Sequence, residues 1–190
     1  MKKKELDGFV EFVFTTRSSE EIMNKSLGNI IYNKRTETDY DEILIGTFAF
    51  YYLDYCPMAY ELHSIFEAHS FELCGIAEDM VNENLSDFVN CFSFMDETHS
   101  LVLLDRIEIM EEYRGYGIAR DLIGFFKHYF GSATILLKAF PLQYEGLKKC
   151  NTKEFKEAEK KVIKAYKDCG MKQVKRNSPY LYSLGGTLQF

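Results

Sequence analysis

The segment Leu101–Phe130 constrains the fold most, because it places a strand, a glycine-containing turn and a helix directly after one another. It begins with LVLLDRIEIM, a run of apolar and β-branched residues that predicts a largely buried strand. The turn EEYRGYGIA follows, with two glycines and one arginine. In the last part, apolar residues recur at the spacing of one helix face: Ile118, Leu122, Phe125, Phe126 and Tyr129.

A turn from strand into helix that contains glycine is suited to binding an anion. Gly115 and Gly117 have no Cβ, so the backbone can come close to a ligand there. The first N–H groups of the following helix have no partner inside the helix, and they lie at its positive end. The sequence therefore predicts an anionic group at the start of this helix. The alternative is that both glycines serve only the geometry of the turn.

The spacing of this loop distinguishes between the known phosphate-binding motifs. The dinucleotide motif G-x-G-x-x-G needs a third glycine where this chain has Arg120, and no Gly-Lys-Ser/Thr of a P-loop follows. The string RGYGIA resembles the Arg/Gln-x-x-Gly-x-Gly/Ala loop of the GNAT superfamily of acyl-CoA-dependent N-acyltransferases, and the preceding Glu-Glu-Tyr is similar to that family's Pro-Glu-Tyr.

The resemblance implies that the loop amides hold the pyrophosphate of coenzyme A and that Arg114 helps to order the loop. It also implies that the end of the preceding strand offers backbone groups to the pantetheine arm. The expected cofactor-binding residues are Ile109, Met110, Arg114, Gly115, Tyr116, Gly117, Ile118, Ala119 and Arg120.

A second match lies near the C-terminus, where AYKDCGM is similar to the family's Tyr-x-x-x-Gly-Phe at a helix end. Tyr166 falls on the tyrosine that often protonates the leaving thiolate, and a phenol with a pKa of about 10 can donate to a thiolate of pKa about 8.5. The alternative is that Tyr166 only packs in an amphipathic helix. For the general base we prefer Glu108, with Asp105 or water as alternatives; a regular strand places the two carboxylates on opposite faces.

The rest of the sequence predicts an α/β (α+β) fold in which helices flank one central, mixed, mostly antiparallel sheet. We expect a single GNAT-like domain over residues 1–190, with a variable N-terminal half (1–100) on the acceptor side and an acetyl-CoA-binding core (101–184) that carries the resemblance. A helical insertion at 57–90, broken near residue 70, departs from the family, which usually has its helices after the first strand. Other expected elements are strands at 8–15, 29–33, 42–54, 133–140, 173–175 and 180–184, a short helix at 18–27, and a helix from 151 or 152 to 170.

Composition excludes several classes of protein. The net charge of -6 argues against nucleic-acid binding, which requires a basic surface. Five cysteines without a C-x-x-C pair indicate a reduced, cytoplasmic protein rather than a disulfide framework or a zinc site. The four histidines have no metal-ligand spacing, so no metal is expected. There is no apolar run long enough for a membrane helix and no signal-peptide pattern.

The resemblance to the GNAT superfamily implies an N-acetyltransferase that transfers an acetyl group from acetyl-CoA to a primary amine by direct attack. The acceptor, a small molecule or a peptide, is not identified by any motif, and the protein is expected to be a monomer or a homodimer without nucleic-acid or membrane partners. The alternative is a non-catalytic acyl-CoA-binding regulatory module. A nucleotide-binding protein unrelated to coenzyme A is disfavoured by Arg120.

Overall fold

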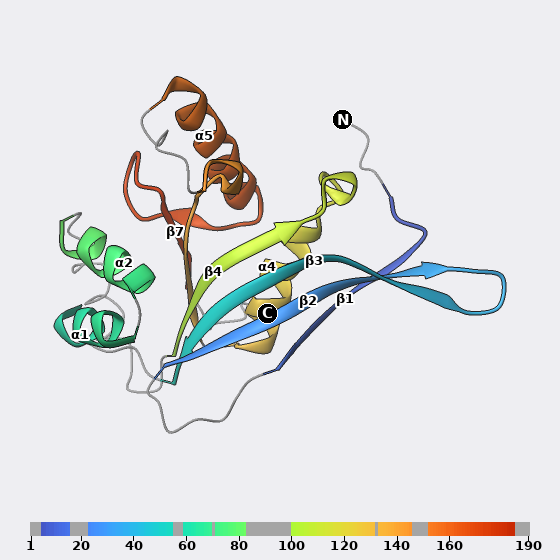
Figure 1. Cartoon of the computed structure of the whole chain (residues 1–190), viewed down its shortest axis with the longest axis horizontal. Coiled ribbons are helices and arrows are strands. Elements are labelled where there is room, and N and C mark those ends of the chain that lie inside the picture. The colour runs from blue at the N-terminus through green and yellow to red at the C-terminus, as the bar shows by residue number, and fades with distance from the viewer. Residues whose placement is uncertain are drawn as a thin grey trace.

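A computed structural model describes residues 5–15, 23–54, 59–69, 71–82, 100–131, 133–145 and 152–184. Helices and strands alternate in groups along the chain (Figure 1). Their bounds are β1 Gly8–Thr15, β2 Asn24–Arg35, β3 Tyr40–Leu53, α1 Ala59–His69, α2 Phe71–Asn82, β4 Leu101–Ile109, η1 Glu111–Tyr113, α4 Ile118–Tyr129, β5 Thr134–Lys138, η2 Leu142–Tyr144, α5 Lys153–Asp168, β6 Lys172–Gln173 and β7 Tyr180–Ser183.

In the described part of the chain, seven strands form one sheet in the order β1-β2-β3-β4-β5-β7-β6. Every neighbouring pair is antiparallel except β4 and β5, which are parallel and joined by the crossover helix α4. The expected mixed, mostly antiparallel sheet flanked by helices is thus confirmed. Strands from the N-terminal half pair directly with β4, so both halves of the chain share this sheet.

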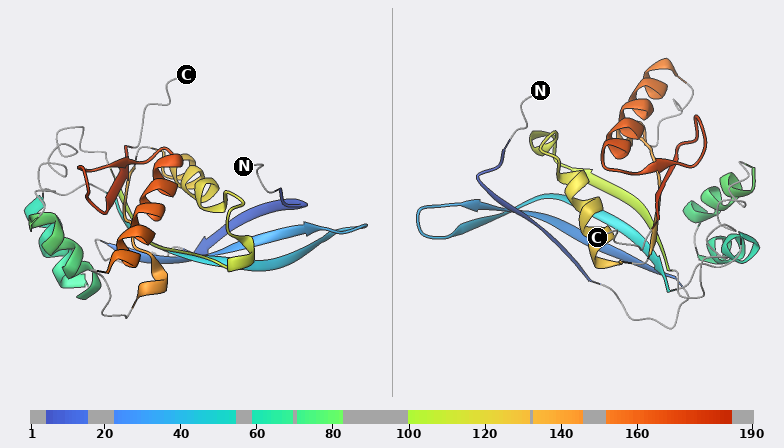
Figure 2. Two further views of the ribbon diagram at one scale, coloured as in Figure 1. Left: turned by 90° about the horizontal axis from the view of Figure 1, so that it is seen from above. Right: turned by 180° about the vertical axis from the view of Figure 1, so that it is seen from behind.

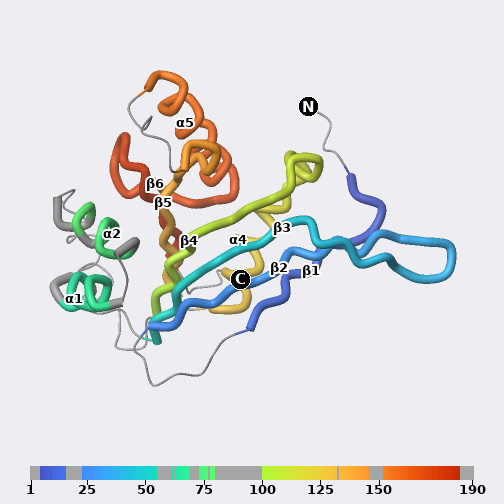
Figure 3. Tube along the Cα trace, in the orientation of Figure 1, coloured from blue at the N-terminus to red at the C-terminus, as the bar shows by residue number. Residues whose placement is uncertain are grey.

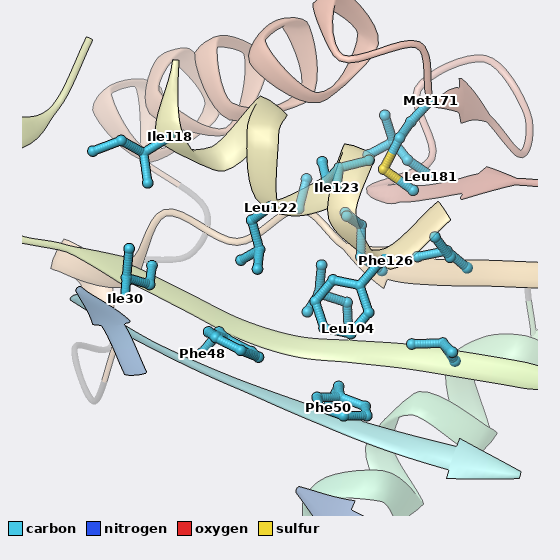
Figure 4. Packing of buried hydrophobic residues seen from close by; sticks show 14 of the residues in the cluster. Ile30, Phe48, Phe50, Leu104, Ile118, Leu122, Ile123, Phe126, Met171 and Leu181 are labelled. Carbon is cyan, nitrogen blue, oxygen red and sulfur yellow. The ribbon is translucent and has the colours of Figure 1, made fainter. Parts of the chain in front are cut away.

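The face of the sheet that packs against α4, here called the α4 face, carries the larger hydrophobic core. Helix α4 crosses this face in the rear view of Figure 2. Its inward side chains meet apolar residues of β2 to β5, and the Phe126 ring lies edge-on to the Phe50 ring at 4.9 Å between centroids (Figure 4). The buried members from α4 and the facing strands include Ile118, Leu122, Ile123, Phe126, Ile30, Phe48, Phe50, Leu104 and Leu137.

The opposite face, here called the α2 face, is covered at one end by α1 and α2. Leu101, Leu103 and Leu136 of the sheet pack there against Phe66 of α1 and Leu73 of α2. The two faces alternate along β4, because successive side chains of a strand point to opposite sides. Two helices, α1 and α2, thus occupy the predicted helical block, and they contribute to the core of the sheet. The predicted break near residue 70 falls on a residue outside the described part of the chain. Residues 57–58 and 83–90 of that block lie outside the described part of the chain.

The β2–β3 hairpin is longer than the sequence indicated, and it extends past the end of β4 (Figure 3). The prediction of a helix through residue 27 was wrong for Asn24–Leu27, which lies in β2; residues 18–22 are outside the described chain. Buried Ser26 and Gly28 alternate with exposed Leu27 and Asn29, which is the period of a strand. Pairing with β1 on one side and β3 on the other stabilises this segment as a strand despite its serine and glycine.

The helices end at residue types that are typical of helix termini. Thr152 caps α5, accepting a hydrogen bond from the backbone N–H of Phe155 at 3.2 Å. Gly131 and Gly170 follow the last turns of α4 and α5 with φ of 42° and 80°, the left-handed conformation that ends helices at glycine. The predicted end of α5 at residue 170 is confirmed, since Gly170 follows its last turn; the last strands are present but shorter than expected.

Truncating Leu122 should destabilise the fold strongly. Its side chain is fully buried between α4 and the sheet, so Leu122→Ala is expected to lower the free energy of unfolding by about 2–5 kcal/mol. Leu27→Ala is the matched control: Leu27 is 67% exposed, and the loss there should stay below about 1 kcal/mol. Urea unfolding measures both. Equal losses would contradict the placement of the core on the α4 face.

Candidate functional site

Strands β4 and β5 begin as neighbours and then diverge, as their ribbons show in Figure 1. Their pairing covers four residue pairs and ends at Leu104 with Leu137. β4 continues alongside β3 as far as Ile109, whereas β5 turns towards β7, with Lys138 opposite Tyr180. Beyond Leu104, therefore, β5 supplies no partner to the edge of β4. We call this region the strand gap. Its narrow end lies at Leu104 and Leu137, where the pairing stops, and its wide end lies at the end of β4 near Ile109.

Alternation along β4 shows which backbone groups face the strand gap. The N–H of Met110 donates to the carbonyl of Ile45 on β3 at 2.9 Å, so the groups of Ile109 and Ile107 point the other way. The carbonyl of Met110 also accepts a hydrogen bond, from the N–H of Tyr113. Both backbone groups of Met110 are thus engaged within the protein. Among the described residues, the open edge therefore consists of the backbone groups of Ile107 and the N–H of Ile109, because the carbonyl of Ile109 accepts a hydrogen bond from Arg114. Ile107 was not expected from the sequence.

The glycine loop lies at the wide end of the strand gap. Gly115 and Gly117 have φ of 83° and 89°, values that residues with a Cβ rarely adopt. Gly117 is the N-cap of α4, and no side chain caps the helix; its first internal bond is from the N–H of Asp121 to the carbonyl of Gly117 at 3.0 Å. The amides of Ile118, Ala119 and Arg120 precede that bond, so they are the ones available to an anion.

Arg114 ties this loop to the end of β4. Its Nε donates to the carbonyl of Ile109 at 2.9 Å, and its own backbone N–H donates to the carbonyl of Glu111 at 3.1 Å. The guanidinium is exposed, so its outer nitrogens face solvent. The position of Arg114 is that of a residue that orders the loop.

A β-bulge places the charged residues of β4 on one face. Ala49 pairs with Arg106 and Phe50 with Leu104, so Asp105 is an extra residue without an opposite partner. Asp105 forms an ion pair with Lys25 at 3.2 Å, and the Lys25 ammonium lies over the ring of Tyr51 on the α2 face. The sequence expectation for a regular strand, with Asp105 and Glu108 on opposite faces, is therefore wrong. Because of the bulge, Asp105 and Arg106 lie on the same face, and side chains alternate regularly again from Arg106 onwards.

Arg106 connects the two sides of the strand gap on the α2 face. One guanidinium nitrogen donates to Glu108 at 2.8 Å and the other to Glu145, which follows β5 and η2. These hydrogen bonds, first that to Glu108, raise the pKa of Arg106. Glu108 therefore lies at the gap, but its carboxylate is already paired, and neither Arg106 nor Glu145 was expected from the sequence.

Tyr166 lies on the other face of the sheet. Its side chain is partly buried and packs against the hydrophobic core of the α4 face. Burial, and to a lesser extent the nearby Cys169, raises the pKa of Tyr166 to about 12. The phenol therefore keeps its proton at neutral pH. The expected acid and base thus lie on opposite faces of the sheet.

A further polar cluster, formed by Asp79, Lys138 and Tyr180, lies at the narrow end of the strand gap. Oδ2 of Asp79 on α2 accepts hydrogen bonds from the Lys138 ammonium at 2.5 Å and the Tyr180 hydroxyl at 2.7 Å. Lys138 and Tyr180 are opposite one another on β5 and β7, and Tyr180 is fully buried. Sequence reasoning missed all three residues, because they are far apart in the chain and belong to no motif.

Among the described residues, no group of three or more His, Cys, Asp or Glu side chains is arranged to hold a metal ion. None of the helices in the described ranges is both long enough and apolar enough to cross a membrane. A comparison with models of protein families and a search of curated proteins found no match.

Removing the side chain of Arg114 should loosen the glycine loop without unfolding the protein. Arg114→Met loses the hydrogen bond to the Ile109 carbonyl, which is expected to cost about 1 kcal/mol and to speed amide hydrogen exchange in residues 114–120. Arg120→Met is the control, since Arg120 pairs only with its neighbour Asp121 among the described residues. Similar exchange rates in the two variants would show that Arg114 does not order the loop.

The pKa of Tyr166 predicts how stability changes at high pH. The phenol has a pKa of 10.0 when exposed in the unfolded chain and about 12 in the folded protein, so the folded state holds its proton more tightly. The resulting stabilisation is complete below pH 10 and is lost as the pH rises towards 12. In urea unfolding at a series of alkaline pH values, Tyr166→Phe should lose less stability than the wild type over this interval. Parallel curves would count against a buried phenol.

Proposed function

We propose that this protein is an N-acetyltransferase that moves an acetyl group from acetyl-CoA to a primary amine. The observation that supports it most is one combination: an uncapped helix N-terminus with two left-handed glycines adjoins an open strand edge. The first feature suits a pyrophosphate and the second a chain of amide groups, and coenzyme A carries both in that order. The resemblance of RGYGIA to the GNAT loop supports the same reading.

In this proposal the α4 face receives the cofactor. The amides of Ile118, Ala119 and Arg120 bind the pyrophosphate, and Gly115 and Gly117 permit its close approach. The backbone groups of Ile107 and the N–H of Ile109 pair with the pantetheine amides, as an added strand would, while the carbonyl of Ile109 stays bound to Arg114. The acyl end then points towards the narrow end of the strand gap.

The chemistry needs a proton donor for the departing sulfur and an acceptor for the proton of the amine. The amine nitrogen bonds to the acetyl carbon, the carbon–sulfur bond breaks, and Tyr166 supplies a proton to the thiolate. The amine loses its proton to Glu108, Asp105 or water on the α2 face; the ion pairs of both carboxylates leave this choice open. Approach of the two substrates from opposite faces explains the separation of acid and base by the sheet.

A cytoplasmic location belongs to the same proposal. Cys74 and Cys169 are free thiols, which persist in a reducing compartment. The acceptor would be a small molecule or a peptide, and no metal takes part in the proposed steps.

Replacing the phenol should slow turnover while leaving cofactor binding intact. In an assay of free thiol released from acetyl-CoA with a panel of primary amines, Tyr166→Phe is expected to lower kcat by about 10²-fold or more, the contribution of a general acid. The KM for acetyl-CoA should not change. Tyr129→Phe, at an exposed position of α4, is the matched control and should behave as wild type.

Two results would redirect the proposal. Binding of acetyl-CoA by calorimetry without turnover of any amine would favour a non-catalytic acyl-CoA-binding regulatory module. Binding of NAD or ATP without binding of acetyl-CoA would favour a nucleotide-binding protein and would overturn the proposal.

A further inference from the structure

The carboxylate of Asp79 is held in one orientation by two donors on the same oxygen. The Lys138 ammonium and the Tyr180 hydroxyl both bind Oδ2, and the Lys138 ammonium also lies 5.4 Å from the centre of the Tyr180 ring. Within the described ranges, no donor binds the other oxygen, Oδ1. The Asp79 side chain is 38% exposed, so solvent reaches it although Tyr180 beside it is fully buried.

This carboxylate stands beside the narrow end of the strand gap. Lys138 is the first residue of β5 beyond the last pair with β4, Leu104 with Leu137. Its side chain points to the α2 face, since the alternate residue Leu136 packs there. Asp79 therefore approaches the gap from the face opposite α4, on which the proposed cofactor loop lies.

We propose that Asp79 binds the ammonium group of the acceptor amine through Oδ1 and thereby selects cationic primary amines. This inference rests on the proposed function, because it places the acceptor opposite the cofactor at the gap. It also assigns a role to α2, which has no recognisable motif: the helix brings a carboxylate to the acceptor side. Tyr180 acts as the positioning residue for this carboxylate, and Lys138 is the internal cation that the amine competes with.

The charged residues near Asp79 determine how tightly this site binds the amine. Lys138 neutralises Asp79 in the unliganded protein, while Glu159 of α5 and Lys156 are the other charged groups that interact here. Burial raises the pKa of Glu159, an effect opposed by Lys138 and Lys156. An acceptor ammonium at Oδ1 would therefore compete with Lys138 for the carboxylate. Removing Lys138 should consequently strengthen binding of the amine, whereas removing the charge of Asp79 should weaken it.

The experiment compares a cationic with an uncharged acceptor. With saturating acetyl-CoA, Asp79→Asn should raise the KM for 1,4-diaminobutane about tenfold or more, the effect of losing one charge-assisted hydrogen bond, and leave the KM for acetyl-CoA unchanged. For 4-methoxyaniline, an amine without charge at neutral pH, kcat/KM should be the same in both proteins. Glu78→Gln, on the exposed side of α2, is the matched control.

A second variant, Lys138→Met, distinguishes binding of the amine by Asp79 from a purely structural role of the cluster. Lys138→Met should lower the dissociation constant of 1,4-diaminobutane, measured by calorimetry in the presence of coenzyme A, while Asp79→Asn raises it. A purely structural cluster would weaken binding in both variants, and that result would overturn the inference. An Asp79→Asn variant that retains wild-type KM values for the diamine would also overturn it, with the proposed function intact. Asp79-dependent binding of the diamine without any turnover would support the inference and reject the acetyltransferase.

Discussion

The structure depends on the unequal hydrogen bonding of the two edges of β4. Its edge towards β3 is paired along nearly its whole length, whereas its edge towards β5 is paired over four residues only. The paired edge holds the strand rigidly against a fully buried aromatic core. The open edge leaves peptide groups to be satisfied by solvent or by a ligand, since such groups are costly to leave without a partner. Strand β4 thus has one edge fixed in the sheet and one edge that β5 leaves without a partner beyond Leu104.

The bulge at Asp105 shows how a single inserted residue arranges charge. It brings Asp105, Arg106 and Glu108 to the same face, and each carboxylate then meets a cation. Such exposed ion pairs contribute little to stability individually, on the order of 1 kcal/mol or less. Their effect is on the geometry of this region. The side chain of Arg106 links β4 to Glu145 in the segment after β5, at a position where the two strands are no longer paired. On the α2 face, this side-chain contact therefore crosses the strand gap.

Much of this fold could be predicted from sequence, because its central elements have strong local patterns. The apolar run at Leu101, the glycines of the loop and the helical stripe from Ile118 each follow from short-range rules. The start of β2 was predicted wrongly, since Ser26 and Gly28 form a strand only through pairing with β1 and β3. The faces of the β4 carboxylates, and the meeting of Asp79 with Tyr180, depend on register and on contacts between distant segments. No local pattern encodes either of these.

The contact between Asp79 and Tyr180 joins residues 101 positions apart, which has a consequence for how the molecule matures. Closing so long a loop is entropically expensive, so contacts of this kind form late, after the local hairpin β2–β3 and the helices. A nascent or partly opened chain can keep most of its aromatic core and yet lack the Asp79 cluster. Integrity of this cluster is therefore a more sensitive indicator of complete folding than the bulk of the sheet.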